Sequence, residues 1–364
     1  MVIIMDFCPY CMMPATGNQC NHCGKATAYT AGAYQLPAGT ILQAAGGWHT
    51  YQIGAVLGQG GFGITYIARL LETGQRVAIK EYYPNHCAQR TGGRTIGPLP
   101  GKEMSFQKGM AGFLREAKLL AGLKPLPSVV KALDYFQYNG TAYLAMEFLD
   151  GVSLSEKVKQ RGTIPAKQLI PRFKPLLKDM ESMHRDGIIH RDVAPDNIMW
   201  MPDGTLKLMD FGCARSTEAQ ALTVMLKPRF APVEQYSNIS QGPWTDVYGV
   251  AATIYYCITG RVPDDAIERL ENPSAMPTPT QLHVDISPQQ EKAIMWGLTV
   301  QPKHRPQSMD EFMDELYASA VPNTLQTWKI KVASILYSKI TILLLGILAG
   351  VLLMFLFFEL MPVK

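Results

Sequence analysis

The sequence contains little of what marks disordered, fibrous or nucleic-acid-binding chains. Charged residues make up 18% of the 364 residues and hydrophobic residues 47%, and the 31 glycines and 25 prolines form no repeat. This composition excludes a disordered or collagen-like chain. The net charge is only +4, and there is no long Lys/Arg block or basic stripe interleaved with aromatic residues. We therefore expect no nucleic-acid partner.

A secretory signal is also missing from the sequence. The apolar run 2–5 is interrupted by Asp6, and no cleavage motif follows it. The main body of the chain is therefore expected to lie in the reducing cytosol, where disulfide bonds are rare.

Cysteine is unevenly distributed, with four of the seven cysteines in the first 23 residues. Two Cys-x-x-Cys pairs, separated by eight residues and followed by a glycine, are typical of a tetrahedral four-thiolate Zn²⁺ site. The segment 1–27 thus resembles a short zinc ribbon, whose metal would be structural because four ligands leave no open position. A disulfide framework, an iron site and a redox dithiol are the alternatives. The predicted ligands are Cys8, Cys11, Cys20 and Cys23.

Long apolar runs are absent until the 19-residue stretch 340–358, whose only polar residue is Thr341. As a helix it would be about 28 Å long, close to the thickness of the hydrocarbon core of a bilayer. A buried globular helix is the alternative, but such a helix normally keeps a polar stripe. We therefore predict a transmembrane helix over 340–358, preceded by a juxtamembrane segment, 321–339, and followed by a short tail, 359–364.

The charges around this run predict its orientation. Lys329, Lys331 and Lys339 precede it, whereas Glu359 and Lys364 follow it. By the positive-inside rule, we expect a single-pass anchor in the inner (cytoplasmic) membrane, with the large N-terminal part in the cytoplasm. Positions 346 and 350 are both glycine, a spacing that would let two spans form a homodimer or that arises by chance.

Between these ends, the hydrophobic pattern changes from strands to helices. The Gly-, Ala- and Thr-rich segment 28–50 has no sustained period and is predicted to be a linker. After Gly151 the pattern is mainly helical. The pattern predicts strands over 51–57, 64–70, 75–80, 129–136 and 141–148, a helix over 113–123 and a tight turn at Asn139-Gly140. We therefore expect an α+β chain with two lobes and a cleft between them.

A Gly-x-Gly-x-x-Gly run, from Gly58 to Gly63, lies between two predicted strands. This position disfavours a dinucleotide-binding fold, in which the run joins a strand to a helix. Glycine lets the backbone close over phosphate groups because it has no Cβ. Lys80 follows on a strand from which it could reach those phosphates, and Glu116 could orient it by an ion pair. For either residue alone, a solvated surface charge is the alternative.

A second group of motifs supplies side chains for phosphoryl transfer. His190-Arg191-Asp192 is followed by Asn197 and then by Asp210-Phe211-Gly212. Phosphoryl transfer needs a carboxylate that positions the acceptor hydroxyl and oxygen ligands for Mg²⁺, and these residues supply both at the spacing of protein kinases. Over about 51–316 the chain therefore resembles a eukaryotic-like (Hanks-type) serine/threonine protein kinase. Segments 61–66 and 78–84 are similar to the bacterial branch in particular.

The resemblance implies a bilobal protein-kinase fold, with a strand-rich N-lobe over 51–148 and a helical C-lobe over 149–320. It also implies ATP and Mg²⁺ as cofactors and proteins as substrates. According to this resemblance, the glycine loop covers the ATP phosphates, and Glu147 to Leu149 form the hinge that binds the adenine edge. Asp192 would accept or orient the proton of the substrate hydroxyl. It assigns catalysis to Asp192, Lys80 and Glu116, ATP binding to Gly58, Gly60, Gly61, Gly63, Ala78, Lys80, Glu147 and Leu149, Mg²⁺ binding to Asn197 and Asp210, and structural roles to Asp246, Glu234 and Arg305.

Two features depart from the kinase pattern. Ala194 stands where serine/threonine kinases usually place a lysine, and the segment 81–112 is longer than a minimal kinase needs. An ATP-binding pseudokinase or scaffold is therefore an alternative to an active enzyme, and a small-molecule kinase is a third. The complete motif set favours activity, and the Pro-x-Glu element that ends at Glu234 favours a protein substrate.

Overall fold

The computed structural model describes residues 7–44, 49–211, 227–236, 240–271 and 276–318, together with the backbone of 215–216. Residues up to Leu316 belong to one structural unit. The predicted transmembrane helix 340–358 and the segments that flank it lie outside the described residues. Among the residues that are described, no helix has the length and apolar character needed to cross a bilayer.

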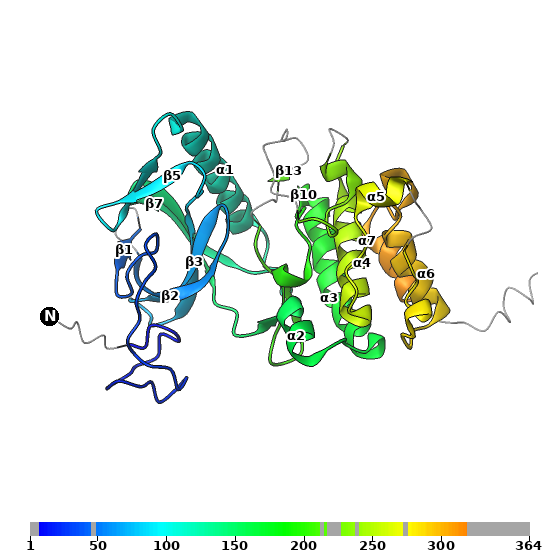
Figure 1. Ribbon diagram of the computed structural model, residues 1–364, viewed down its shortest axis with the longest axis horizontal. Coiled ribbons are helices and arrows are strands. Elements are labelled where there is room, and N and C mark those ends of the chain that lie inside the picture. The colour runs from blue at the N-terminus through cyan, green and yellow to red at the C-terminus, as the bar shows by residue number, and fades with distance from the viewer. Residues whose placement is uncertain are drawn as a thin grey trace, which may run out of the picture. The chain divides into compact units, whose positions relative to one another are not determined.

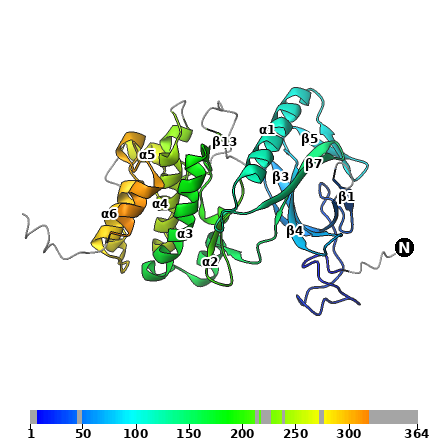
Figure 2. The ribbon, with the colours of Figure 1, turned by 180° about the vertical axis from the view of Figure 1, so that it is seen from behind.

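The strand-rich lobe is built on one antiparallel sheet with the strand order β1-β2-β3-β4-β8-β7. The hairpin β5-β6 pairs outside this sheet, and α1 lies across one sheet face, against β7 and β8 (Figures 1 and 2). The elements of this lobe are β1 (Ile41–Gln43), β2 (Thr50–Gln59), β3 (Gly63–Leu70), β4 (Arg76–Tyr82), β5 (Ala88–Thr91), β6 (Thr95–Pro98), α1 (Glu103–Gly122), β7 (Ala132–Tyr138) and β8 (Thr141–Glu147).

Strand β8 is buried on both faces, which explains its almost wholly apolar sequence. Leu144 and Met146 share a cluster with Ala117 and Leu120 of α1. Tyr143, on the other face, belongs to the main core of the lobe. The turn before β8 has positive φ values at both Asn139 and Gly140, 50° and 76°, as predicted for a tight hairpin.

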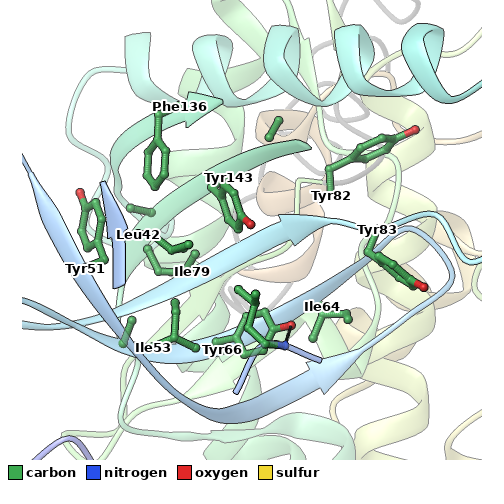
Figure 3. Packing of buried hydrophobic residues seen from close by; sticks show 14 of the residues in the cluster. Leu42, Tyr51, Ile53, Ile64, Tyr66, Ile79, Tyr82, Tyr83, Phe136 and Tyr143 are labelled. Atoms are coloured by element: carbon green, nitrogen blue, oxygen red, sulfur yellow. Dashed lines mark hydrogen bonds between the residues drawn. The ribbon is translucent and has the colours of Figure 1, made fainter. Parts of the chain in front are cut away.

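An aromatic row forms the centre of the main core (Figure 3). The rings of Tyr51 and Phe136 stack with their centroids 5.7 Å apart, and Phe136 stacks on Tyr143 at 5.3 Å. Tyr66 lies on the neighbouring strand β3, and its hydroxyl accepts a hydrogen bond from the Leu36 amide at 3.0 Å. The row ties β2, β7 and β8 together, and β2 is the strand that leads into the glycine loop.

The segment 28–50, predicted to be a linker, contributes to this lobe. It contains strand β1, which pairs with β2 from Ile41↔Gln52 to Gln43↔Thr50. Leu36 and Leu42 are fully buried in the main core. The prediction missed this because the apolar residues of this Gly-, Ala- and Thr-rich segment have no sustained period, and β1 forms only by pairing with β2.

The long segment 81–112 forms the hairpin β5-β6 and the first half of α1, which begins ten residues before the predicted helix. The hairpin is attached through a buried ion pair between Arg90 and Glu81, whose closest atoms are 2.5 Å apart. Two tyrosine hydroxyls, of Tyr66 and Tyr143, donate to the same carboxylate at 3.0 and 2.8 Å. Burial, followed by the charge of Glu81, raises the pKa of both tyrosines, so they remain neutral donors.

The helical lobe follows the strand-rich lobe along the chain. The apolar face of α3 from Phe173 to Met183 is fully buried. The elements are β9 (Val152–Ser153), α2 (Leu154–Arg161), α3 (Ala166–Arg185), β10 (Ile188–Ile189), η1 (Pro195–Asn197), β11 (Ile198–Trp200), β12 (Leu206–Leu208), β13 (Arg215–Ser216), η2 (Val233–Gln235), α4 (Pro243–Thr259), α5 (Ala266–Glu271), η3 (Thr280–Leu282), α6 (Pro288–Gly297), η4 (Pro302–His304) and α7 (Met309–Leu316).

Candidate active site

The glycine loop connects β2 to β3, as the sequence predicts. Its tip is tied to the residues after β4, because the amides of Tyr83 and Asn85 donate to the carbonyls of Phe62 and Gly61 at 3.1 and 3.2 Å. A Cβ at Gly63 would lie 2.5 Å from the carbonyl oxygen of Glu81, so only glycine allows this close approach. By contrast, no atom lies within 4 Å of the Cβ position at Gly58 or Gly60, which leaves room for a ligand against the loop.

Lys80 extends from β4 toward the helical lobe. Its ammonium group forms an ion pair with the carboxylate of Asp210, which brings together two residues that are 130 positions apart. Glu116, the predicted partner of Lys80, lies on a half-buried part of α1 beside the buried Ala117. The pair between Lys80 and Asp210 joins the predicted phosphate-binding cation to a predicted Mg²⁺ ligand.

The catalytic loop, residues 190–197, brings together two further predicted residues. The side-chain amide nitrogen of Asn197 donates to the backbone oxygen of Asp192 and to its carboxylate oxygen Oδ2, both at 2.8 Å. Because these bonds use the nitrogen, the carbonyl oxygen of Asn197 is the atom that it presents as a metal ligand. Asn197 is buried at the end of η1, a short 3₁₀ turn.

Asp246, on α4, holds the backbone of the catalytic loop. Its carboxylate accepts hydrogen bonds from the backbone amides of His190 and Arg191 at 2.8 and 2.7 Å, and it contacts Nε2 of His184 at 2.8 Å. Burial alone would raise the pKa of Asp246, but the contacts with His184 and the loop amides lower it below its ordinary value. The charged carboxylate is therefore the form that fixes the loop, as the kinase resemblance implies.

The electrostatics of Asp192 fit a group that handles a proton. Burial and then the negative charge of Asp210 raise its pKa to about 6. The positive charges of Lys227 and Lys80 and the hydrogen bond from Asn197 oppose this shift, and Lys227 has the largest opposing effect.

The predicted adenine site lies where β4 and β8 pair. Ala78 is opposite Met146 in the register of these strands and is nearly buried. The backbone amide of Glu147 donates to the Lys131 carbonyl at 2.9 Å, and its carboxylate accepts from Lys207 Nζ at 2.6 Å. Leu149 packs against the same apolar cluster as Ala78.

The four predicted zinc ligands form one cluster. Their sulfur atoms lie within 4.8 Å of one another, with 3.6 Å between Cys8 and Cys23 and 3.7 Å between Cys11 and Cys20. The backbone amides of Cys23 and His22 lower the pKa of Cys20 to about 7. His22 itself is exposed. We call residues 8–23 the cysteine knuckle.

The cysteine knuckle packs directly on the strand-rich lobe. Met12 lies in an apolar cluster with Ala55 of β2 and Ile67 of β3. The Ala55 amide donates to the Pro9 carbonyl at 2.7 Å, at a point where the register of β2 against β3 shifts. Phe148, the middle residue of the predicted hinge, borders the same cluster.

One residue near the site is absent from the sequence-based prediction. Lys227 forms an ion pair with Asp196, which belongs to the catalytic loop. The sequence offers one signal, the absence of a lysine at Ala194. This absence does not show which other residue of the chain brings a cation to the catalytic loop.

The protein kinase domain family matches residues 51–319 of the chain. A probable serine/threonine-protein kinase of Streptomyces coelicolor is 28% identical over 286 residues, which cover 74% of this chain and 39% of that protein. The serine/threonine-protein kinase pkn3 of Myxococcus xanthus is 28% identical over 290 residues, which cover 74% of this chain and 50% of the relative. The chain thus spans half or less of the length of these relatives.

A solved structure shows the same similarity in three dimensions. The structure described as the apo form of PpkA-294 is 31% identical to this chain, with a TM-score of 0.68. The match covers 78% of this chain and all of the solved one.

Proposed function

Because the chain belongs to the protein kinase family, we propose that it transfers the γ-phosphate of ATP to serine and threonine hydroxyls of protein substrates. The observation that carries this proposal is the pair of contacts that joins Lys80 to Asp210 and Asn197 to Asp192. The second contact lies within the catalytic loop, and the first joins that region to the strand-rich lobe. A scaffold that had lost catalysis would not need all four groups in this arrangement.

The residues present fit ATP and Mg²⁺. The open Cβ positions at Gly58 and Gly60 leave the loop backbone accessible to phosphate oxygens. The carboxylate of Asp210 and the carbonyl oxygen of Asn197 are hard oxygen ligands, the type that Mg²⁺ prefers. When bound, Mg²⁺ would neutralise phosphate charge, and Lys80 would hold the α- and β-phosphates as the resemblance implies.

In the proposed transfer, the substrate hydroxyl oxygen forms a bond to the γ-phosphorus while the bond from that phosphorus to the ADP oxygen breaks. The hydroxyl proton passes to the carboxylate of Asp192. Asn197 holds this carboxylate through the 2.8 Å hydrogen bond to Oδ2, which orients it for the proton. Positioning and charge neutralisation account for most of the catalysis in such reactions.

The test compares wild type with Asp192→Asn, which preserves the size of the side chain. Purified full-length protein is incubated with Mg²⁺, labelled ATP and a generic basic protein substrate. We expect slow phosphorylation of serine and threonine by wild type and a loss of at least about a hundredfold in Asp192→Asn. Equal inertness of the two proteins, with nucleotide binding retained in both, would favour the pseudokinase alternative.

We also propose that the cysteine knuckle binds one Zn²⁺. A tetrahedral site with Zn–S bonds of about 2.3 Å places its sulfur atoms about 3.8 Å apart. This is close to the 3.6 Å between the sulfur atoms of Cys8 and Cys23 and the 3.7 Å between those of Cys11 and Cys20. Four thiolates are a closed structural set, and iron is the alternative metal. Metal analysis of the full chain should give one zinc per chain, reduced in Cys11→Ser with Cys23→Ser. Cys87→Ala serves as the control outside the cluster, and full metal retention in the double variant would contradict the proposal.

We further propose that 340–358 anchors the protein in the inner membrane, with the kinase domain in the cytoplasm. Two copies of the chain would form a homodimer through contact between their single spans. The length of the run and the lysines before it support this. Two substitutions, Leu344→Arg and Leu352→Arg, should move the full-length protein from the membrane to the soluble fraction, because each charge costs about 2.5–3.5 kcal/mol in a span. The corresponding alanine substitutions are the control, and an unchanged membrane fraction in the arginine variant would refute the anchor.

A further inference from the structure

The catalytic loop contains no cation of its own between Asp192 and Asn197. The four intervening residues are Val193, Ala194, Pro195 and Asp196. Ala194 is fully buried where the loop enters η1, so its methyl group carries no charge and contributes only to packing. The one charged side chain of this stretch, Asp196, is negative.

A cation reaches the loop from a distant part of the sequence. The ammonium group of Lys227 donates a hydrogen bond to Oδ2 of Asp196, across 31 residues of sequence. The Lys227 side chain is 32% exposed and that of Asp196 is 47% exposed, so the pair lies at the edge of the site, open to a ligand. Partial burial would raise the pKa of Asp196, but the bond and the charge of Lys227 lower it.

The backbone around Lys227 is fixed, so its position is not that of a free surface side chain. The amides of Phe230 and Ala231 donate to the Lys227 carbonyl at 3.2 and 3.0 Å. Further along, the side chain of Gln235 donates to the carbonyl of Arg191 at 2.7 Å. The segment from 227 to 235 is therefore attached to the catalytic loop at both of its ends.

The contact with Asp196 places the Lys227 ammonium group on the catalytic loop itself. Asp196 lies four residues after Asp192 and directly before Asn197, and the same loop is attached to the segment 227–235 through Arg191.

We propose that Lys227 supplies the positive charge that Ala194 leaves out of the catalytic loop, and that it stabilises the negative charge on the phosphoryl group during transfer. This role rests on the proposed kinase function. Lys227 would release part of its contact with Asp196 and turn to the phosphate oxygens when substrate binds. The segment that follows the Asp-Phe-Gly motif would then contribute a catalytic group and not only a surface for the protein substrate.

The kinetic test moves the lysine between the two positions. Lys227→Ala should lower kcat about a hundredfold, the usual cost of one preorganised donor, with KM for ATP changed less than about threefold. Lys227→Arg should keep activity within about tenfold of wild type. Adding Ala194→Lys to Lys227→Ala should recover at least tenfold in kcat, because a positive charge returns to the catalytic loop. Lys159→Ala removes an exposed lysine near Asp196 and should leave kcat unchanged.

Asp196→Asn distinguishes a catalytic cation from a structural contact. This substitution weakens the ion pair but keeps the lysine. The loss of kcat in Asp196→Asn should therefore be at least tenfold smaller than the loss in Lys227→Ala. Equal losses in Asp196→Asn and Lys227→Ala, with no recovery from Ala194→Lys, would show that the ion pair only holds the segment in place and would overturn the proposal.

A labelling experiment tests the placement without relying on activity. An acyl-phosphate derivative of ATP acylates lysines that lie beside the nucleotide phosphates, and mass spectrometry locates them. We expect modification of Lys80 and Lys227, both blocked by excess ATP, and none of Lys159. Modification of Lys80 alone would overturn the proposal. If wild type showed no activity sensitive to Asp192→Asn, the kinase function would fail, whereas the labelling would still decide where Lys227 lies.

Discussion

The packing of the cysteine knuckle on β2 depends on the absence of a side chain at Gly54. A Cβ at this position would lie 2.4 Å from the carbonyl oxygen of Pro9, 2.6 Å from the sulfur of Met12 and 2.9 Å from Cγ2 of Ile67. The methionine side chain can move, but the Pro9 oxygen is backbone and Ile67 is fully buried. Gly54→Ala should therefore push the cysteine knuckle away from the sheet.

The magnitude follows from the contacts that would be lost. The hydrogen bond from the Ala55 amide to the Pro9 carbonyl contributes about 0.5–1.5 kcal/mol net. Met12 is only 3% exposed, and full burial of such a side chain contributes about 1.5–3 kcal/mol. The sum sets an upper limit of about 4.5 kcal/mol. Partial relaxation of Met12 reduces the expected cost to about 2 kcal/mol, since its side chain is flexible.

Amide hydrogen exchange at Ala55 is the direct assay. A loss of about 2 kcal/mol corresponds to exchange about thirtyfold faster at this amide. The matched control is Gly97→Ala in β6, because the Cβ position at Gly97 has no atom within 4 Å; this variant should leave the exchange of Ala55 unchanged. Metal content should be the same in both variants. Unchanged protection of Ala55 in Gly54→Ala would refute the packing argument.

Three substitutions of buried charges test the rest of the fold. Arg305 contacts Glu234 twice at 2.8 Å, and both side chains are fully buried. Arg305→Ala should therefore lower the free energy of unfolding, measured in urea, by about 3–5 kcal/mol. A loss below about 1 kcal/mol would contradict this. Arg90→Met should cost a similar amount by leaving Glu81 buried without its cation, and adding Glu81→Gln should recover part of the loss. Asp246→Asn should lower the free energy of unfolding by about 2 kcal/mol at pH 7. Because the folded-state pKa of Asp246 lies below its ordinary 3.8, this difference in stability from wild type should shrink below about pH 4. A stability difference that is independent of pH would refute the assignment.

Local signals in the sequence were enough to predict the strands around the glycine loop. The glycine run and the Asn139-Gly140 dipeptide each predict a local backbone conformation, because positive φ or close backbone approach requires these residue types. The cysteine spacing predicted the cluster at the N-terminus because two Cys-x-x-Cys pairs are the usual ligand spacing of a four-thiolate metal site. Each of these predictions needs only a few consecutive residues.

Features that depend on partners distant in the sequence could not be predicted in this way. Strand β1 has three residues and exists because the edge of β2 accepts it. The hairpin β5-β6 is held by Arg90, whose partner Glu81 reads in the sequence as an ordinary charge after Lys80. Lys227 is similar, since only the folded chain shows that it reaches Asp196.

Backbone strain explains why the catalytic loop depends on elements later in the chain. Arg191 and Asp210 have positive φ values, 67° and 61°, which cost on the order of 1–3 kcal/mol each and persist only where other contacts impose them. At Arg191 both backbone groups are held, since its amide donates to Asp246 and its carbonyl accepts from Gln235. The element η2, which contains Gln235, continues from the turn that carries Lys227. A change in the segment 227–235 therefore acts on the catalytic loop in two ways, through the backbone of Arg191 and through the ion pair with Asp196.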